Sequence, residues 1–193
     1  MVVSATKGLE LNTGKRMSQI MEMELPSFLH SSMCAISGPN LASEITQGKP
    51  SSTVVASKNI TAARKVQTII NSTMFRVYTN DDIIGVEYGG ALKNIIALGA
   101  GICDGLKYGD NAKSAFITRG LTEITRLGVT AGANPITFLG LSGIGDLITT
   151  CNSRLSRNHY VGEQLTAGKK LDEIRSGMKQ VAEGIDTTSG AVY

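Results

Sequence analysis

The sequence predicts an α/β region followed by an all-α region. Before about residue 80, short apolar runs typical of strands alternate with helix-like segments, which is the pattern of an α/β sheet. After that point, apolar residues recur with a helical period over longer segments. The change falls at Asn80-Asp81-Asp82, a cluster of residues that favour the start of a helix. We therefore expect two domains, residues 1–80 and residues 81–193.

The first region contains four candidate strands and three candidate helices. The strands are expected at residues 2–5, 34–37, 53–56 and 75–78, and the helices at residues 15–24, 41–47 and 61–71. This alternation predicts part of a Rossmann-like parallel sheet. The Gly-rich turn that usually follows the first strand of such a sheet is not found in that context. Gly99-Ala100-Gly101 falls within a helical pattern and is a poor candidate for that turn.

The second region contains helical periods only. They cover residues 83–107, 111–128, 135–150, 157–167 and 171–176. Asn111 is expected to cap the start of its helix, and Gly128 and Gly132 are expected to end it. Another helix is expected to begin near Ala191, so both ends of the sequence look cut.

The composition is that of an ordinary globular protein. Of 193 residues, 41% are hydrophobic and 18% are charged, and the net charge of +3 comes from scattered Lys and Arg. This distribution favours a small anionic substrate and gives no indication of a nucleic-acid partner. No apolar run reaches the length of a membrane span, and no signal peptide is expected. Cys34, Cys103 and Cys151 are expected to be reduced thiols without a metal, and His30 and His159 to be ordinary residues.

Lys93 is the first candidate for chemistry, because it interrupts a helix of small and apolar residues. The helical period places it beside Gly90, Asn94 and Ala97, and the small residues there would let another backbone come close. A buried ammonium group loses water, which lowers its pKa and suits it to acid–base catalysis near neutral pH. The alternative is a stem packed on apolar surface with the amine in water.

Four further positions bring polar groups to element boundaries. Lys7 directly follows the first strand, at the edge of the sheet where ligands of α/β proteins bind, and Ser37-Gly38-Pro39 follows the second. Asp146 opens an apolar run and could hold an ammonium group or simply cap a helix. Arg157 has the planar fork that suits a phosphate or carboxylate, although it could equally be a surface residue at the start of a helix.

Together these residues resemble the NAD(P)-dependent glycerol-3-phosphate dehydrogenases of the bacterial and plastid type. The resemblance covers nearly the whole chain and rests on six motifs in order. They are Ala5-Thr6-Lys7-Gly8-Leu9-Glu10, Ser37-Gly38-Pro39, Gly90-Ala91-Leu92-Lys93-Asn94, the run from Gly140 to Cys151, Leu155-Ser156-Arg157-Asn158 and Val181-Ala182-Glu183-Gly184.

The resemblance implies hydride transfer between NAD or NADP and the dihydroxyacetone phosphate/glycerol 3-phosphate pair, which feeds glycerophospholipid synthesis. Lys93 would be the general acid and base, Lys7 would contact the substrate and polarise its oxygen, and Asp146 would hold both lysines. The implied substrate contacts are Lys7, Gly38, Asn40, Asn94, Thr150, Ser156, Arg157 and Asn158. The implied cofactor contacts are Lys7, Ala42, Arg157, Val181 and Glu183. Asn40 departs from the Ser or Thr that the family often has there.

The resemblance also sets expectations for the whole protein. The family's first Gly-rich βαβ unit and its C-terminal helices are missing, so we expect a fragment that alone binds cofactor poorly. The helical part would be a substrate-binding and dimerisation domain, with a homodimer in the full-length family and a location in the cytoplasm or, alternatively, the plastid stroma. The choice between NAD and NADP stays open, because the residue that reads the ribose would lie in the missing part.

Two other interpretations stay open. The chain could be a non-catalytic remnant that serves as a binding or oligomerising module, which the missing Gly-rich turn favours. It could also be another hydroxyacid dehydrogenase of similar layout, against which Gly145-Asp146-Leu147 and Ser156-Arg157-Asn158 argue. Four retained polar groups, Lys7, Lys93, Asp146 and Arg157, favour the enzyme.

Overall fold

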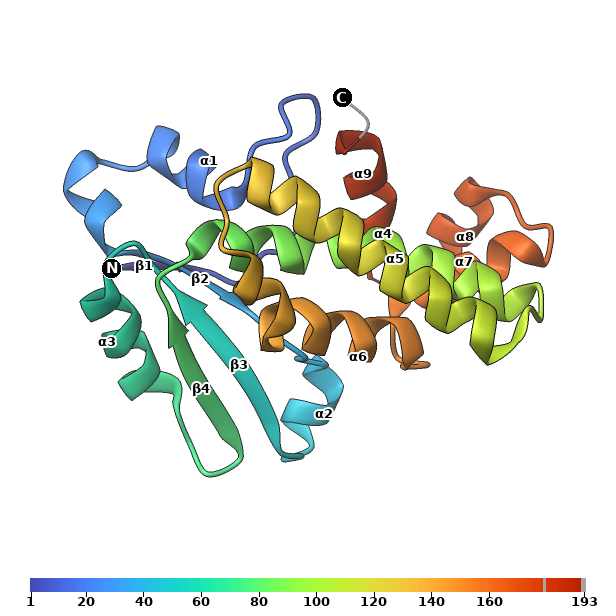
Figure 1. Cartoon of the computed structure of the whole chain (residues 1–193), viewed down its shortest axis with the longest axis horizontal. Helices are drawn as coiled ribbons and strands as arrows, with labels where there is room; N and C mark the ends of the chain where they lie inside the picture. The colour runs from blue at the N-terminus through green and yellow to red at the C-terminus, as the bar shows by residue number, and fades with distance from the viewer. Residues whose placement is uncertain (179, 192–193) are drawn as a thin grey trace.

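A four-stranded sheet forms one end of the molecule, and helices form the other (Figure 1). The structure is a computed structural model that describes residues 1–178 and 180–191. The strands are β1 (Val2–Ser4), β2 (Met33–Ser37), β3 (Ser51–Ala56) and β4 (Phe75–Asn80), and they lie side by side in chain order. β2, β3 and β4 contain the runs that the sequence predicts, and β1 ends one residue before the end of its predicted run, residues 2–5. An α/β region followed by a helical region is thus confirmed.

The prediction of a parallel sheet is wrong for one of its three strand pairs. β1 pairs with β2 and β3 with β4 in parallel, but β2 and β3 are antiparallel, with Ile36 opposite Val55. The link between β2 and β3 contains only α2 (Ala42–Thr46). A helix of five residues spans about 7 Å, too little to carry the chain back along the sheet, so β3 returns from the end where β2 stops.

The remaining elements are helical. Around the sheet these are α1 (Met17–Glu24), the 3₁₀ turn η1 (Ser27–Ser32) and α3 (Ile60–Ile70). Beyond it come α4 (Ile83–Gly105), α5 (Gly109–Thr130), the 3₁₀ turn η2 (Pro135–Leu139), the π turn η3 (Leu141–Gly145), α6 (Asp146–Asn152), α7 (Arg157–Thr166), α8 (Leu171–Gly177) and α9 (Glu183–Gly190). None of the helices described is long and apolar enough to cross a membrane.

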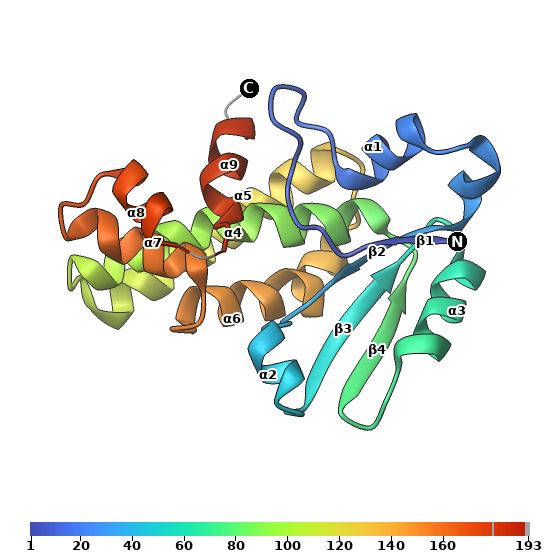
Figure 2. The ribbon, with the colours of Figure 1, turned by 180° about the vertical axis from the view of Figure 1, so that it is seen from behind.

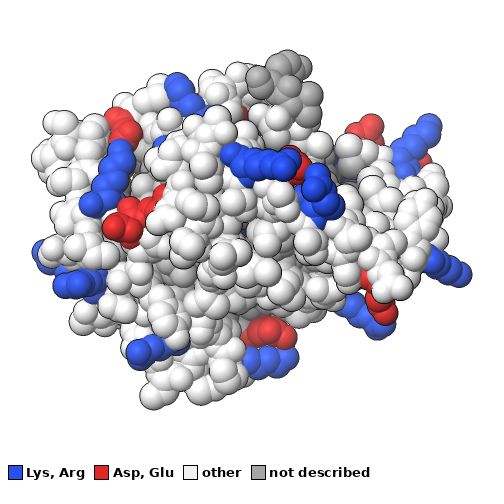
Figure 3. Space-filling model, viewed as in Figure 1, with Lys and Arg blue, Asp and Glu red and all other residues white. Residues whose placement is uncertain are grey.

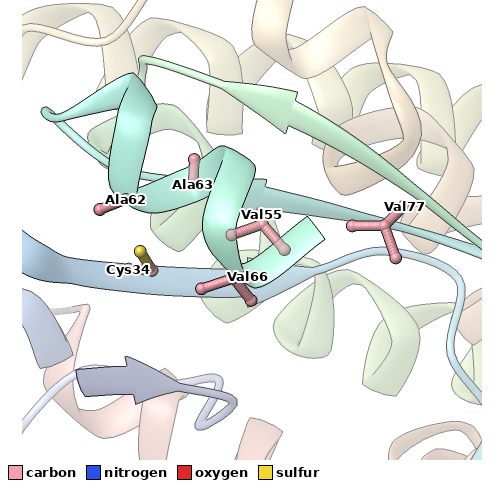
Figure 4. Close-up of a cluster of buried hydrophobic side chains, with 6 residues drawn as sticks. All are labelled: Cys34, Val55, Ala62, Ala63, Val66 and Val77. Carbon is pink, nitrogen blue, oxygen red and sulfur yellow. The ribbon is translucent and has the colours of Figure 1, made fainter. Parts of the chain in front are cut away.

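The sheet is covered on both faces, because its strands are apolar on both sides. One face carries Cys34, Val55 and Val77, which pack against Ala63 and Val66 of α3 (Figure 4). The other face, with Ala35, Val54 and Ala56, packs against Ile83 and Val86 at the start of α4. Asp82 caps α4 through the N–H of Gly85, as the polar cluster before it predicts. The first turns of α4 therefore belong to the core of the sheet.

α4 then continues into the helical region as its central element (Figure 2). Glycine lets α7 lie directly against it, since a Cβ added at Gly101 would stand 2.0 Å from the backbone oxygen of His159. On another side, Ala97 and Ala100 pack with Leu147 and Cys151 of α6. The close approach of another backbone, expected from the small residues, is thus made by α7.

Three expectations for the helical region need correction. α5 begins at Gly109 and not at Asn111, and it runs through Gly128, which sits under the ring of Phe138. Gly132, with φ of 93°, is the glycine that follows the helix end. The expected helix near Ala191 is also misplaced, because Ala191 is the residue after α9; Val192 and Tyr193 lie outside the described residues.

The expected helix at residues 135–150 is broken into η2, η3 and α6. The break has a packing reason. A Cβ at Gly143 would stand 2.1 Å from the backbone oxygen of Phe138, so the chain folds back on itself more tightly than a straight helix permits. Phe138 itself is fully buried beside Leu92 and Ile124. The fold-back brings Asp146 to the start of its own short helix, facing α4.

The three cysteines, all within the described residues, carry free thiols. Cys34 and Cys151 are fully buried, in the sheet core and the helical core respectively, and Cys103 is partly exposed. Burial raises the pKa of Cys151 to about 12 and also raises that of Cys34.

Candidate active site

Two lysines share one aspartate where the sheet meets the helices. Lys7 Nζ lies 2.6 Å from Asp146 Oδ2, and Lys93 Nζ lies 2.5 Å from Asp146 Oδ1. Asp146 is 1% exposed and Lys93 is 6% exposed, whereas the side chain of Lys7 is 21% exposed. The carboxylate therefore binds each ammonium with a different oxygen, and the three groups form a row that opens at Lys7.

The parallel pairing of β1 and β2 explains the position of Lys7. Both strands end at the same edge, so the loop after β1 passes the loop after β2, and Lys7 Nζ donates to the carbonyl oxygen of Gly38 at 3.0 Å. Gly90 lets α4 approach this edge, because a Cβ there would stand 2.6 Å from Ser37 Oγ. Lys93 lies one helical turn beyond Gly90 and so reaches the same place.

Asp146 and Thr150 form the opposite wall. They lie one turn apart on α6, and Thr150 Oγ1 is 2.6 Å from Lys93 Nζ. The π turn before α6 sets the direction in which Asp146 points, and such turns often occur at functional sites. The hydroxyl of Thr150 donates a hydrogen bond to the carbonyl oxygen of Asp146, 2.7 Å away, and accepts one from the ammonium of Lys93.

The surroundings of Lys93 set its proton affinity. Burial lowers its pKa from 10.5 to about 8. The charge of Asp146 opposes this change, the charge of Lys7 adds to it, and the hydrogen bond to Asp146 and the more distant charge of Glu183 oppose it again. The ammonium is thus the main form at neutral pH but loses its proton far more readily than an exposed lysine.

Asn94 and Asn158 form a second buried pair beside the lysines. Asn158 Nδ2 donates to Asn94 Oδ1 at 2.9 Å, and Asn158 Oδ1 accepts from the backbone N–H of Gly184 at 2.9 Å. The pair ties α4, α7 and the start of α9 together. The neighbouring Ser156 caps α7 by accepting from the N–H of His159.

These groups line a cavity of about 500 Å³. Eleven of the residues singled out in the sequence contribute to its wall: Lys7, Asn40, Ala42, Lys93, Asn94, Asp146, Thr150, Ser156, Arg157, Asn158 and Glu183. Gly38 contributes only through its hydrogen bond with Lys7. Val181 is not brought to this wall; it is 64% exposed and borders a different cavity, next to Ala182 and Ile185.

Arg157 and Glu183 form an ion pair at the wall of the cavity. Arg157 Nη2 lies 3.0 Å from Glu183 Oε1, and their side chains are 40% and 36% exposed. An exposed pair of this kind is held weakly, so Arg157 can turn to a bound anion. On the face seen in Figure 3, Lys and Arg are spread out, and several lie beside acidic residues. Ion pairs on the surface include Lys58 with Glu22 and Arg119 and Arg126 with Glu123.

Sequence reasoning missed several residues of the site. Ser37 lies 3.4 Å from Asp146 through its hydroxyl, and Thr149, Leu155 and Gln180 line the cavity. Ser37, Thr149 and Leu155 lie within the motifs singled out in the sequence, but no role in the site was predicted for them. His159, expected to be an ordinary residue, does not line the cavity; its Nε2 lies 2.7 Å from Asp104 Oδ2, to which Lys113 also donates. Burial acts to raise the pKa of Asp104, but those two partners lower it below its ordinary value.

The donor set of the cavity fits an anionic ligand. Lys7 and Arg157 supply positive charge, and Asn94 and Thr150 supply amide and hydroxyl groups. Cations and neutral donors of this kind suit phosphate groups, in a small substrate or in a dinucleotide. No group of three His, Cys, Asp or Glu side chains that could hold a metal ion occurs among residues 1–178 and 180–191.

A mostly parallel α/β sheet and a helical region that share one polar site define a protein of two-part α/β and all-α architecture. Two sequence profiles match the chain: NAD-dependent glycerol-3-phosphate dehydrogenase N-terminus over residues 1–63, and the C-terminus of the same enzyme over residues 82–193. The chain therefore belongs to the NAD-dependent glycerol-3-phosphate dehydrogenase family.

Individual relatives agree with this assignment. The chain is 56% identical over 191 residues to the glycerol-3-phosphate dehydrogenase [NAD(P)+] of Dehalococcoides mccartyi, covering 99% of this chain and 53% of that protein. The enzyme of the same name from Chlorobium limicola is 52% identical, with coverage of 100% and 57%. The chain thus spans about half the length of the curated relatives it matches.

Solved structures give the same result for the fold. Glycerol-3-phosphate dehydrogenase from Coxiella burnetii superposes with a TM-score of 0.92 at 39% identity, covering 98% of this chain and 57% of that one. The yeast enzyme superposes with a TM-score of 0.84 at 30% identity, again covering 98% of this chain and 57% of the other.

Proposed function

We propose that the chain carries the acid–base and phosphate-binding part of an NAD(P)-dependent glycerol-3-phosphate dehydrogenase. The reaction interconverts sn-glycerol 3-phosphate and dihydroxyacetone phosphate and feeds glycerophospholipid synthesis. The observation that carries the proposal is the buried ammonium of Lys93, held between Asp146 and Thr150 at the wall of a cavity that also contains Lys7 and Arg157.

Lys93 acts on the oxygen of the reacting carbon. A nicotinamide cofactor, when bound, would supply the hydride for reduction of the carbonyl carbon. Lys93 donates a proton to the carbonyl oxygen, which becomes the hydroxyl of glycerol 3-phosphate; in the reverse direction it takes that proton back. Lys7 polarises the same oxygen, and Asp146 fixes both ammonium groups by charge-assisted hydrogen bonds.

Other residues of the cavity hold the substrate and the cofactor. When substrate binds, the guanidinium of Arg157 leaves the carboxylate of Glu183 and binds the substrate phosphate, because its two N–H edges can donate to two phosphate oxygens. Neighbouring polar positions contribute further substrate contacts: Gly38, Asn40, Asn94, Thr150, Ser156 and Asn158. The cofactor side is formed by Lys7, Ala42, Arg157, Val181 and Glu183, of which Val181 would have to move toward the cavity.

The proposal extends to the whole protein. Residues 1–80 form part of the dinucleotide-binding domain and residues 81–193 part of the helical substrate domain. The full-length enzyme would be a homodimer located in the cytoplasm or, alternatively, in the plastid stroma. A non-catalytic binding or oligomerising module is the second candidate, in which the row of Lys7, Asp146 and Lys93 would serve only to join the sheet to the helices.

Turnover in a chimera tests the proposal. This chain replaces the matching part of the Dehalococcoides mccartyi enzyme, so that both flanking segments are supplied, and NADH and NADPH oxidation with dihydroxyacetone phosphate is measured. We expect turnover in the chimera, and a loss of at least about 100-fold in Lys93→Met, because general acid–base catalysis contributes that much.

The control is cofactor binding, measured by NADH fluorescence in the same two proteins. Lys93→Met should leave cofactor affinity nearly unchanged, because Lys93 acts on the substrate oxygen. A folded chimera that binds cofactor but turns over no substrate supports the module. Equal turnover with and without Lys93 contradicts its role as acid and base.

A further inference from the structure

A second buried ion pair lies outside the cavity, between the segment that follows Lys7 and the helix that carries Lys93. Arg16 Nη1 lies 2.5 Å from Glu87 Oε2 on α4, and the two side chains are 10% and 7% exposed. The mechanism above uses neither residue. A pair so well shielded from water is held much more firmly than the surface pairs of this molecule.

Glu87 uses both of its carboxylate oxygens. Oε1 accepts from the backbone N–H of Ser18 at 2.7 Å, and Oε2 accepts from the hydroxyl of Ser18 at 2.6 Å as well as from Arg16. Ser18 lies in the first turn of α1, so its N–H has no acceptor within the helix, and Glu87 supplies one. Arg16 also lies over the ring of Tyr88, 5.9 Å from its centre. We call Arg16, Ser18 and Glu87 the α1 latch.

The α1 latch is joined to Lys7 through a short hairpin. Leu9 and Arg16 form an antiparallel bridge, and the N–H of Glu10 donates to the carbonyl oxygen of Lys15 at 2.9 Å. Lys7 stands only two residues before Leu9, in a loop that leaves β1 after Ser4. Its backbone is therefore held by β1 on one side and by the latched hairpin on the other. Figure 2 shows this N-terminal segment running over α4.

The same helix carries both attachment points. Glu87 precedes Lys93 by six residues, or about 9 Å along α4. α4 thus fixes Lys93 directly and Lys7 through the latch, while Asp146 joins the two ammonium groups from the other side. We propose that Arg16 and Glu87 are positioning residues, which hold the Lys7 loop against α4 so that both lysines meet the two oxygens of Asp146.

The consequence of a broken latch follows from charge. When the loop loosens, Lys7 withdraws from Asp146, and Lys93 loses a neighbouring positive charge and gains a larger share of the carboxylate. The charged groups that act on Lys93 are Asp146, Lys7 and Glu183. Both changes raise the pKa of Lys93 above about 8. The direct effect of removing the Glu87 charge has the opposite sign, because it would lower that pKa.

Titration of Lys93 in Glu87→Gln tests this inference. The whole chain is labelled with ¹³C-lysine, and the Lys93 signal, assigned through its loss in Lys93→Arg, is followed by NMR from pH 6 to pH 11. We expect the pKa to rise from about 8 toward 10.5 in Glu87→Gln. The matched control is Glu22→Gln. Glu22 lies on α1 and forms a surface ion pair with Lys58, so its replacement should leave the pKa of Lys93 unchanged.

A merely structural latch gives a different result. In that case Glu87→Gln lowers the urea midpoint, and the pKa of Lys93 in the folded protein stays at about 8 or falls, which would overturn the inference. If Glu87→Gln does not fold, two milder variants replace it. Arg16→Lys keeps both charges, and Ser18→Ala removes the hydroxyl that donates to Glu87 and accepts from Arg16. Each should raise the pKa of Lys93. The inference rests on the proposed roles of Lys7 and Lys93. The titration does not depend on turnover, so a chimera without activity would leave the result for the α1 latch readable by itself.

Discussion

At the scale of single residues, Lys93 shows how burial and pairing compete. Loss of water disfavours the ammonium form, and the neighbouring charge of Lys7 adds to that effect. Asp146 supplies the opposing attraction and a hydrogen bond. The result is a lysine whose pKa lies near 8, close enough to neutral pH for proton transfer in both directions.

This pKa predicts how stability depends on pH. In the unfolded chain Lys93 titrates near 10.5, and in the folded chain near 8. Between these values the unfolded state binds more protons, so the free energy of unfolding rises with pH. Relative to Lys93→Met, the wild-type chain should gain on the order of 3 kcal/mol from pH 8 to pH 10.5, measured by urea unfolding.

Below pH 8 the difference between the two proteins should be flat, since Lys93 is then protonated in both states. The control is Lys58→Met, which removes a lysine whose side chain is 71% exposed and should show no such slope. A difference that stays constant up to pH 10.5 would mean that the folded chain does not lower the pKa of Lys93.

Sequence reasoning reached the residues of the site unevenly. The small and apolar residues around Lys93 made its burial one of two interpretations, the other being an amine in water, and the structure shows burial. The position of Lys7 followed from the end of β1. The joint binding to Asp146 came only from the family resemblance, since 139 residues separate Lys7 from Asp146. The ion pair of Arg16 with Glu87 was not predicted, because no local pattern announces a contact between residues 71 apart.

At the scale of elements, local patterns predicted the strands and the long helices well. They failed where packing decides. The antiparallel pairing of β2 and β3 depends on the short reach of α2, and the break at η3 depends on the approach of Gly143 to Phe138. α9 was missed because its sequence, Glu183–Gly190, has polar and small residues and little apolar period.

The contact between α4 and α7 gives a prediction at this scale. A Cβ at Gly101 would meet the backbone oxygen and carbon of His159 at 2.0 Å and 2.8 Å, and backbone atoms cannot move aside alone. Gly101→Ala should therefore lower the free energy of unfolding by about 1–3 kcal/mol, the usual cost of overpacking. Thermal unfolding followed by circular dichroism measures this change.

Gly177 provides the matched control. It also lies in a helix, α8, but a Cβ there would meet nothing within 4 Å. Gly177→Ala should leave stability unchanged or raise it by up to roughly 1 kcal/mol, because alanine favours helix. Equal destabilisation by both substitutions would show that the space between α4 and α7 does not matter.

At the scale of the whole molecule, Asp146 joins the helical region to the sheet. It is the partner of Lys7 from the loop after β1 and of Lys93 from α4. Asp146→Asn leaves a buried ammonium without a counter-charge and should lower the free energy of unfolding by about 3–5 kcal/mol. Urea unfolding measures this loss.

A double-mutant cycle separates the coupling energy between Lys7 and Asp146 from the other effects of Asp146→Asn on stability. With Lys7→Met in addition, Asp146→Asn should cost clearly less, because one of its two partners is already gone. The control is Asp186→Asn, whose pair with Arg175 is nearly half exposed on both sides and should contribute at most about 1 kcal/mol. Additive effects of Lys7→Met and Asp146→Asn would mean that the ion pair does not couple the two regions.

The three thiols differ in exposure, so their reactivity reports on local opening of the folded chain. A thiol reagent added to the folded protein meets Cys103 first, since Cys34 and Cys151 have no exposed surface. Cys34 lies under α3 in the sheet core, and Cys151 lies under α4 in the helical core. The alkylation rate of Cys34 therefore measures how often the sheet core opens, and that of Cys151 measures how often the helical core opens. Neither measurement needs an engineered label.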